Sequence, residues 1–385
     1  MSIHHDLEQV VRSWHALEAG YDDGVVVIDY DCAVDVHETT PGRDRLSVLE
    51  QLTSIRDCTV DEPAVHGVAT ANATLLGALL GERSDLNNYM AQTQGCHANG
   101  WTRDYVDYVG NVARTMLAEL GIEWGAHTDA ALRERGAPLH PSKVGSAIRS
   151  HADAAESAVR ALTGAGAEFQ LAVEMTDTDA YWSYWLDGAG RSSRLRINTR
   201  RADFNDVDAY RFALHEVLGH ALQFANLAAV AESKDVDWPR VLMIHGPHQV
   251  SFEGLAQMLP LAIGADDERV IAQIRLEHYT QLVRSELHVL VNAGASARAC
   301  RDHAAARVPF WTDRRIGGYL SDRGRDPQLR SYLWAYPAGL DWFMNLHDTG
   351  GSLLAEVLHA AYQRPLVPRE LERLWPAGPR IGGNA

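Results

Sequence analysis

The chain has 385 residues, of which 46% are apolar and 22% charged, a composition that fills a large hydrophobic core and excludes disorder for most of its length. The formal net charge is −16, from 35 basic and 51 acidic residues. This balance argues against nucleic acid and against an anionic membrane surface as partners, because both attract clustered Lys and Arg. One large domain or two moderate ones would fit the length.

The sequence predicts a cytoplasmic protein. Its start, MSIHHDLEQVV, lacks a basic region followed by an apolar one, and no run of about 18 apolar residues predicts a membrane span. The four cysteines are scattered along the chain, which favours a reducing compartment over a disulfide framework.

Apolar residues at spacings of three and four predict helices along most of the chain. The predicted helices are 4–19, 102–120, 142–163, 267–292, 353–363 and 368–375. Gly121 and Gly164 follow two of them as C-terminal caps, and Ser142 is the expected N-cap of the third.

Residues 168–200 depart from the helical pattern. In EFQLAVEMT (168–176) apolar and polar residues alternate, which predicts a half-buried strand. The aromatic AYWSYWL (180–186) and the alternating RLRINTR (194–200) predict two more strands, separated by the turn sequence DGAGRSS. A small sheet is therefore expected just upstream of a helix that starts near Asp206.

The helix that follows the sheet, DVDAYRFALHEVLGHALQFAN (206–226), contains His215, Glu216 and His220. Two imidazoles and a carboxylate on one helix are typical of zinc hydrolases, in which neutral imidazoles hold Zn²⁺ and the Glu polarises a metal-bound water. The apolar flanks predict a buried helix, and a buried charge needs a partner or a metal. This disfavours the alternative of three polar residues on an exposed helix.

The spacing of the two histidines is unusual. At four residues apart, as in the common HExxH motif, they would lie about 40° apart on an ideal helix, whereas at five residues they diverge by about 140°. A π-bulge or a local widening of the turn would return position i+5 to the same face. Gly219, directly before the second histidine, tolerates such a distortion. The sequence thus predicts a widened turn between His215 and His220.

A third protein ligand is needed, so that the fourth position of zinc stays open to water. The candidate is Glu253 in HQVSFEGLAQML (248–259), far enough from His220 for a loop and a second antiparallel helix. The alternative is a carboxylate that only faces the dipole at a helix N-terminus. We expect one Zn²⁺ ion; Fe²⁺ is the weaker possibility, because two His and one carboxylate also suit iron.

HEVLGH resembles the HExxGH motif of the dipeptidyl peptidase III family of zinc peptidases. Over residues 180–375 the chain is more similar to a bacterial metallopeptidase-like group with a HExxPGH motif. The shared features are Asn198-Thr199, Gly219-His220, Leu222-Gln223, Glu253-Gly254, Leu287-His288, and Arg330, Tyr332, Tyr336, Pro337 and Gly339. The resemblance implies a mainly α, gluzincin-like fold: a large helical shell with a small β-sheet beside a zinc-binding active-site helix. It also implies metallopeptidase activity.

Two departures from the HExxPGH pattern bear on the site. The motif here is one residue shorter and lacks the Pro. Anchoring on Tyr-x-x-Gly places Tyr336 in the catalytic role, whereas anchoring on Pro337 places Trp342 or Phe343 there. Loss of the phenol would remove an oxyanion donor and suggest altered chemistry.

Three further side chains are candidates for stabilising a transition-state oxyanion. His288 and Tyr336 are the favoured donors, and Tyr332 is the third. The alternative for each is an ordinary place in the core, since aromatic residues are frequent in this part of the chain.

Other candidates would bind substrate. The strand around 194–199, taken as a sheet edge, could hold an extended peptide by main-chain bonds, with Asn198 nearby. His245 and His248 follow the motif helix in HGPHQ and could contact substrate or simply line a loop. Arg330 carries a fork that fits a carboxylate, although a structural ion pair is the favoured interpretation.

The predicted function is a zinc-dependent hydrolase that cleaves a peptide or amide bond in a short peptide or small peptide-like molecule. His215, His220 and Glu253 would hold Zn²⁺, and Glu216 would take a proton from the bound water and deliver it to the leaving amine. Two alternatives stay open: a metal-dependent lyase or other non-peptidase enzyme of specialised metabolism, and a non-catalytic metal-binding relative.

Three parts are expected along the chain. An N-terminal helical part covers residues 1–170, a metal-binding catalytic part covers 171–375, and a flexible tail covers 376–385. The first two are expected to form one compact unit. The sequence leaves the oligomeric state and the role of the N-terminal part open.

Overall fold

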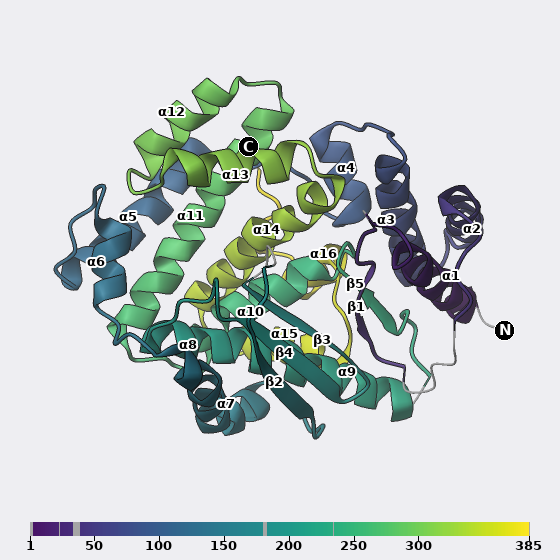
Figure 1. Cartoon of the computed structure of the whole chain (residues 1–385), viewed down its shortest axis with the longest axis horizontal. Helices are drawn as coiled ribbons and strands as arrows, with labels where there is room; N and C mark the ends of the chain where they lie inside the picture. Colours follow the sequence, from purple (N-terminus) through teal and green to yellow (C-terminus); the bar gives the residue numbers. More distant parts are fainter. Residues whose placement is uncertain (1–2, 23, 34–38, 180–182, 234, 385) are drawn as a thin grey trace.

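The computed structural model describes the whole chain except residues 1–2, 23, 34–38, 180–182, 234 and 385. Helices make up most of it and surround one five-stranded sheet (Figure 1). The fold is therefore mainly α with a small sheet, as predicted. No helix in the described part is both long enough and apolar enough to cross a membrane.

The sheet has the strand order β2-β4-β3-β1-β5. β2 (Gln170–Thr176), β3 (Tyr184–Ala189) and β4 (Ser192–Asn198) match the three predicted strands, although residues 180–182 of the second lie outside the described residues. β3 and β4 form an antiparallel hairpin, and β2 runs parallel to β4. β4 is therefore paired on both sides and is not the sheet edge that the sequence analysis expected.

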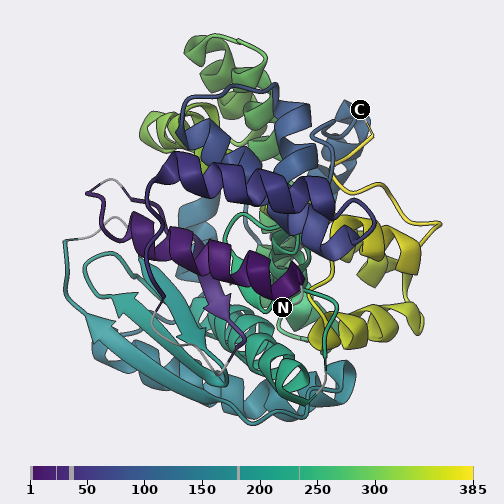
Figure 2. The ribbon, with the colours of Figure 1, turned by 90° about the vertical axis from the view of Figure 1, so that its right-hand side faces the viewer.

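Two short strands missed by the sequence analysis complete the sheet. β1 (Ile28–Asp31) is parallel to β3 and antiparallel to β5 (Val241–Met243). Strands of four and three residues are too short to show a periodic pattern. β1 belongs to the first 170 residues, which were expected to be helical throughout, and Figure 2 shows it beside α1 (Ile3–Glu18).

Helices of the N-terminal part precede the hairpin. After α1 they are α2 (Arg45–Cys58), α3 (Pro63–Leu79), α4 (Leu86–Thr93), α5 (Arg103–Glu119), α6 (Thr128–Glu134) and α7 (Pro141–Thr163). Buried ion pairs fix α1 to the sheet: Glu8 accepts from the Arg240 Nη2 at 2.6 Å, and Arg12 Nε donates to Asp31 Oδ2 at 2.8 Å.

The helices after the hairpin build the rest of the shell. They are α8 (Asp206–Phe212), the π-helix η1 (Ala213–Ala221), α9 (Leu222–Ser233), α10 (Gln249–Ala262), α11 (Glu268–Asn292), α12 (Ala297–Arg307), α13 (Asp313–Gly324), α14 (Pro327–Thr349), α15 (Leu353–Gln363) and α16 (Pro368–Leu374).

The six helices predicted from periodicity are confirmed as α1, α5, α7, α11, α15 and α16, each within one residue at either end. Gly121 and Gly164 both have a left-handed φ of 69°, which confirms them as caps. Ser142 is not the N-cap of α7. His140 takes that place, its Nδ1 accepts from the Ser142 N–H, and Pro141 follows where a missing N–H is harmless.

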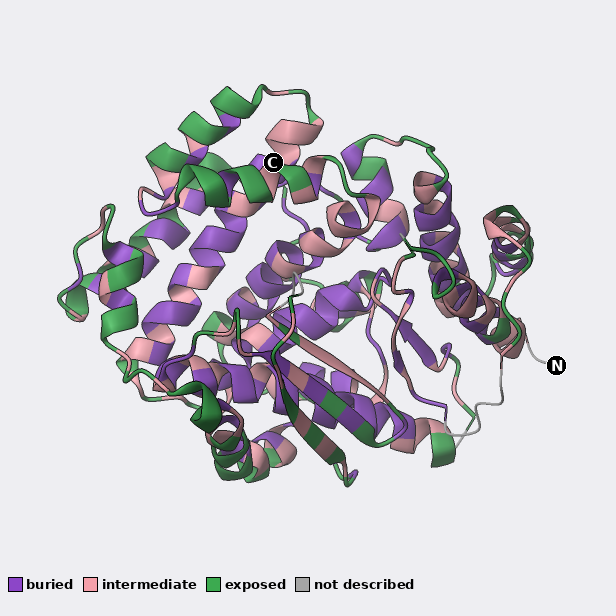
Figure 3. Ribbon diagram, viewed as in Figure 1, coloured by how far each residue is buried: buried purple, intermediate pink, exposed green. Residues whose placement is uncertain are grey.

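α10 and α14 cross in the most buried part of the molecule (Figure 3). Their backbones meet where two glycines face each other. A Cβ on Gly254 would lie 2.3 Å from the carbonyl carbon of Gly339, and one on Gly339 would lie 2.0 Å from Val250 O. Only hydrogen fits at both positions, and this close contact sets Glu253 against the side chains of α14.

Residues 376–385 are predicted to form a flexible tail, but those that the structure describes are instead packed against the rest of the molecule. Ile381 is 3% exposed, and Gly382 O accepts from the Gly100 N–H at 3.0 Å. Gly383 forms an isolated bridge with Gly100. The composition of 376–385 resembles a frayed end, but its glycines allow the backbone to lie directly against residues 97–100.

Gly254→Ala should destabilise the protein by about 3 kcal/mol, because the added methyl meets backbone atoms that cannot rotate away. Urea denaturation measures this change. Gly317→Ala is the matched control: it also lies inside a helix, nothing lies within 4 Å of its added Cβ, and it should be neutral or slightly stabilising. Equal stability of the two variants would contradict the close contact.

Candidate metal centre

The predicted widening of the motif helix is confirmed. Residues 213–221 form the π-helix η1, in which the Leu222 N–H donates to Val217 O, five residues back. The extra residue per turn returns position i+5 to the same face. The Nε2 atoms of His215 and His220 consequently lie 3.2 Å apart.

Gly219 is needed for a different reason from the one expected. Its φ is not in the left-handed region, so conformational freedom does not explain it. A Cβ there would lie 2.7 Å from the Cβ of Ala256 on α10. Gly219 therefore allows η1 to approach the helix that carries the third ligand candidate.

Glu253 completes the cluster from α10. Its Oε2 lies 3.4 Å from His215 Nε2 and 3.9 Å from His220 Nε2. One ligand atom from each of the three residues lies within 4.8 Å of the others. Glu253 is 3% exposed, and no hydrogen bond reaches its Oε2 from the described residues. A buried carboxylate oxygen with no donor, facing two imidazole nitrogens, suits a divalent cation.

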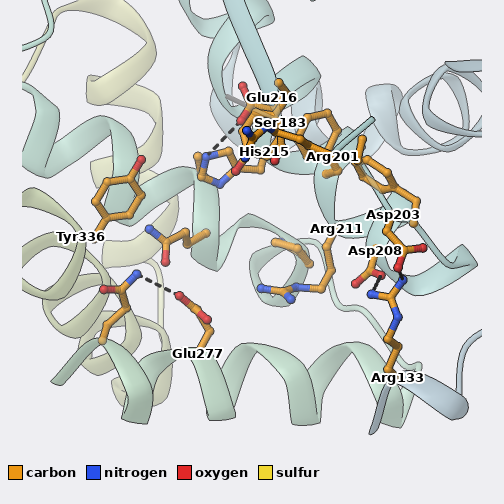
Figure 4. Close-up of a pocket in the computed structure, with 18 residues that line it drawn as sticks. Arg133, Ser183, Arg201, Asp203, Asp208, Arg211, His215, Glu216, Glu277 and Tyr336 are labelled. Atoms are coloured by element: carbon orange, nitrogen blue, oxygen red, sulfur yellow. Dashed lines mark hydrogen bonds and ion pairs between the residues drawn. The ribbon is translucent and has the colours of Figure 1, made fainter. Parts of the chain in front are cut away.

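Two tyrosines of α14 lie next to this cluster. Tyr332 donates from its hydroxyl to Glu253 Oε1 at 2.5 Å, and the hydroxyls of Tyr332 and Tyr336 are 2.9 Å apart. Tyr332 thus orients the ligand carboxylate. Both phenols line the smaller of two cavities, and Tyr336 also lines the larger one (Figure 4). Trp342 and Phe343, the other positions considered for this role, are buried in the core.

Burial governs the protonation of the cluster. It raises the pKa of Glu216 to about 7, with Glu253 adding to the rise and His215 opposing it. It lowers the pKa of His220 to about 3, which leaves a neutral imidazole of the kind that binds metal. Burial would raise the pKa of Glu253, but the charges of His215 and His220 and the hydrogen bond from Tyr332 hold it below its usual range.

Two cavities flank the cluster. One, of about 430 Å³, lies on the His215 side, and the other, of about 280 Å³, lies on the His220 and Glu253 side. Tyr184, Glu216 and Tyr336 line both. The candidate base and the candidate oxyanion donor therefore stand where the linings of the two cavities meet, and the two cavities together are called the cleft below. Figure 4 shows Glu216, His215 and Tyr336 around the larger cavity.

β3, not β4, presents main chain to this cleft. Within the described residues β1 pairs with β3 only at Asp31–Ala189, so Tyr184–Leu186 run beyond that ladder. Ser183 lines the cavity on the His215 side, and Trp185 and Leu186 line the other. No residue of β4, the strand expected to bind peptide, lines either cavity.

His288 lies away from the cluster and lines neither cavity. It is fully buried on α11, with its ring edge-on to Trp334 at 5.4 Å. Trp334 points about 200° around α14 from Tyr336, which places His288 on the opposite side of that helix. The proposed oxyanion role is therefore withdrawn.

Arg330 also faces away from the cleft. Its Nε donates to Asn292 Oδ1 at 2.7 Å and its Nη2 to Ser84 O at 3.0 Å, while the guanidinium covers the ring of Tyr89. It is a structural residue, although hydrogen bonds and a ring contact take the place of the expected ion pair.

Asn198, His245 and His248 do not line the cleft either. Asn198 is fully buried and donates to Thr178 O at 3.0 Å, which ties the end of β4 to the residues just after β2. His248 Nε2 bonds with the main chain of Met243 at 3.0 Å and holds the turn after β5. Burial lowers the pKa of His245 to about 3, so this ring is a neutral core residue.

Several charged residues of the cleft were not predicted from the sequence, among them Arg211, Glu277 and Asp29. Arg211 and Glu277 line the larger cavity, and Asp29 lines the smaller one. Arg211 precedes His215 by four residues, so the motif helix itself contained a signal. Asp29 comes from β1, and nothing local in the sequence connects it with a site more than 180 residues away.

No family model matches the chain, and no curated protein matches it. A search of solved structures finds a similar fold in "the putative lipoprotein from Colwellia psychrerythraea", with a TM-score of 0.56 and 16% sequence identity. The match covers 88% of this chain and 64% of that one, so this chain spans about two thirds of that protein's length. At this identity the likeness shows the fold alone.

Tyr332→Phe removes the hydroxyl that orients Glu253 and keeps the ring. We expect the affinity for zinc to fall roughly 10- to 100-fold, as for other partners of metal ligands. Competition with a chromophoric chelator measures it. Tyr108→Phe makes the same change at a side chain that is 63% exposed and should bind as wild type. An unchanged affinity in Tyr332→Phe would show that this bond does not position a ligand.

Proposed function

We propose that the protein is a zinc-dependent hydrolase that cleaves a peptide or amide bond in short peptides or small peptide-like molecules. The observation that carries this proposal is the π-turn, which brings His215 and His220 together against Glu253, with Glu216 at the junction of two cavities. A π-helical turn is rare and is found frequently at functional sites, and here it brings two imidazoles together.

The donor set fits zinc. Two neutral imidazoles and one carboxylate are the usual ligands of catalytic sites that leave a fourth position open. The donor-free Glu253 Oε2 supports the same assignment. A bound zinc ion would supply a Lewis acid and lower the pKa of a water molecule held there. Tyr332 would keep the ligand carboxylate in place through its bond to Glu253 Oε1.

Glu216 is the proposed base. It adjoins His215 in sequence, and its Oε1 lies 3.7 Å from His215 Nε2. It is buried and lines both cavities, so a substrate in the cleft would lie against it. In this role its carboxylate takes a proton from the attacking water and hands it to the leaving amine.

Tyr336 is the proposed oxyanion donor. Its hydroxyl lies 2.9 Å from that of Tyr332, and because Tyr332 gives its one proton to Glu253, Tyr336 donates to Tyr332 in the absence of substrate. Rotation of the Tyr336 hydroxyl, which lines the cleft, would direct that proton at the oxygen of the scissile carbonyl. The size of the two cavities favours short substrates. An extended segment could add main-chain bonds along Tyr184–Leu186 of β3.

Glu216→Gln should lower kcat by roughly 10²- to 10⁴-fold, because it removes the proton acceptor and keeps the shape of the side chain. Zinc content, measured by inductively coupled plasma mass spectrometry, should stay at one ion per chain. Glu174→Gln, an exposed change on β2, is the control and should keep full activity. Purified protein that neither holds zinc nor gains activity from added zinc would overturn the proposal.

Tyr336→Phe should lower kcat roughly 10²- to 10³-fold at saturating zinc, the effect of losing one oxyanion donor. Zinc affinity should change little, because Tyr336 does not bond to a ligand candidate directly. Tyr332→Phe should show the reverse pattern, with a weaker site and a smaller change in kcat. A zinc-loaded wild type that cleaves no peptide or amide would instead favour another metal-dependent reaction, such as a lyase step.

A further inference from the structure

Arg211 is a cation of the cleft that forms no ion pair within the described residues. It is half-buried on α8, one turn before His215, and lines the larger cavity. Burial lowers the pKa of its guanidinium, and the more distant charges of Glu277 and Asp208 oppose that shift. Its Nη1 donates to Gln273 Oε1 at 3.1 Å, and no carboxylate of the described residues lies within 4.0 Å of it. In Figure 4 its guanidinium points into the space between His215 and Glu277.

Of the other charges that line this cavity, Arg201 is exposed, and Glu277 and Arg133 are already engaged. Glu277 accepts from Arg284 Nη1 at 2.8 Å, and Arg133 Nη2 lies 2.5 Å from Asp203. Arg211 is thus the partly buried guanidinium left with free donors. A guanidinium presents a fork that matches the two oxygens of a carboxylate.

Asp29, which lines the smaller cavity, is an anion without an ion-pair partner among the described residues. Its Oδ2 accepts from Gln249 Nε2 at 2.9 Å. Gln249 stands one turn before Glu253 on α10, so Asp29 is held at a fixed place near the ligand cluster. Burial and the charges of Glu253 and Asp187 raise the pKa of Asp29 to about 6.

The direction of β3 relates these two charges. The strand runs from Ser183 in the Arg211 cavity to Leu186 in the Asp29 cavity. A peptide with its amino end at Asp29 and its carboxyl end at Arg211 would run the other way. Such a peptide would lie antiparallel to Tyr184–Leu186, the commoner and slightly more stable form of pairing.

We propose that the cleft recognises short peptides by both free termini, with Arg211 binding the C-terminal carboxylate and Asp29 binding the N-terminal ammonium. This inference rests on the proposed hydrolase function and narrows its substrate class. The bond to be cleaved then lies between the two charged anchors, beside Glu216 and Tyr336. Blocked peptides and the interior of long chains would lack one or both anchors.

The test begins with a library of di-, tri- and tetrapeptides, from which one sequence cleaved by the zinc-loaded wild type is chosen by mass spectrometry. That sequence is then made in four forms: free at both ends, N-acetylated, C-amidated, and blocked at both ends. We expect kcat/KM to fall roughly tenfold or more for each blocked end, the effect of losing a hydrogen bond to a charged group. Calorimetric binding of the four forms to zinc-loaded Glu216→Gln should show the same order without turnover.

Variants assign each end to its residue. Arg211→Gln should bring the ratio of C-free to C-amidated rates close to one and keep the preference for a free N-terminus. Asp29→Asn should do the reverse. Arg298→Gln, at a side chain that is 90% exposed, and Asp153→Asn, also exposed, remove the same charges elsewhere and should leave both ratios unchanged.

The outcomes separate the two proposals. Peptides cleaved equally well in all four forms would overturn the terminal recognition and leave the hydrolase function standing. Ratios that do not respond to Arg211→Gln and Asp29→Asn would overturn the assignment of the two residues. A zinc-loaded wild type that cleaves no member of the library would overturn the peptide hydrolase function and this inference with it.

Discussion

The candidate metal centre depends on one departure from α-helical geometry. With 3.6 residues per turn, His215 and His220 could not face one ion; η1 removes the difficulty by adding a residue to the turn. The distortion is supported from outside, since Tyr362 donates to Leu218 O at 2.6 Å and Gly219 lies against Ala256. The contact between α10 and α14 at Gly254 then fixes the third ligand candidate. A ligand cluster of three residues thus rests on packing between backbones, where glycine is required for close approach.

Features encoded locally could be predicted from the sequence. Amphipathic helices end where a glycine or a capping residue allows, and six helices of this chain were placed within one residue at either end. The widened turn followed from arithmetic on the motif. β1 and β5 could not be found, because strands of four and three residues are defined by their partners and not by a pattern of their own. The packing of the C-terminal residues could not be predicted for the same reason, because Gly100, which pairs with Gly383, lies more than 280 residues earlier in the chain.

The candidate site shows a similar division. His215, His220 and Glu253 lie together as expected, and Tyr332 and Tyr336 lie beside them. His288 was predicted from a motif of the same kind, but it lies on α11, on the side of α14 that faces away from the cluster. The spacing of residues in the sequence shows which side chains share one face of a helix. It does not show which neighbouring helix that face contacts. The role of each residue in zinc binding and catalysis stays a prediction, and so does the resemblance to zinc peptidases.

The pairing of buried charges bears on what the cleft binds. A charge removed from water costs several kcal/mol unless it is paired, and this molecule pairs most of its buried charges. Glu8 meets Arg240 under α1, and Glu277 meets Arg284. Of the exceptions within the described residues, Arg323 packs on the ring of Tyr319, away from the cleft. Arg211 and Asp29 differ from it because they face open cavities on opposite sides of one ligand cluster. Charges of opposite sign left unpaired at the two ends of a cleft are best satisfied by a ligand that carries both signs itself.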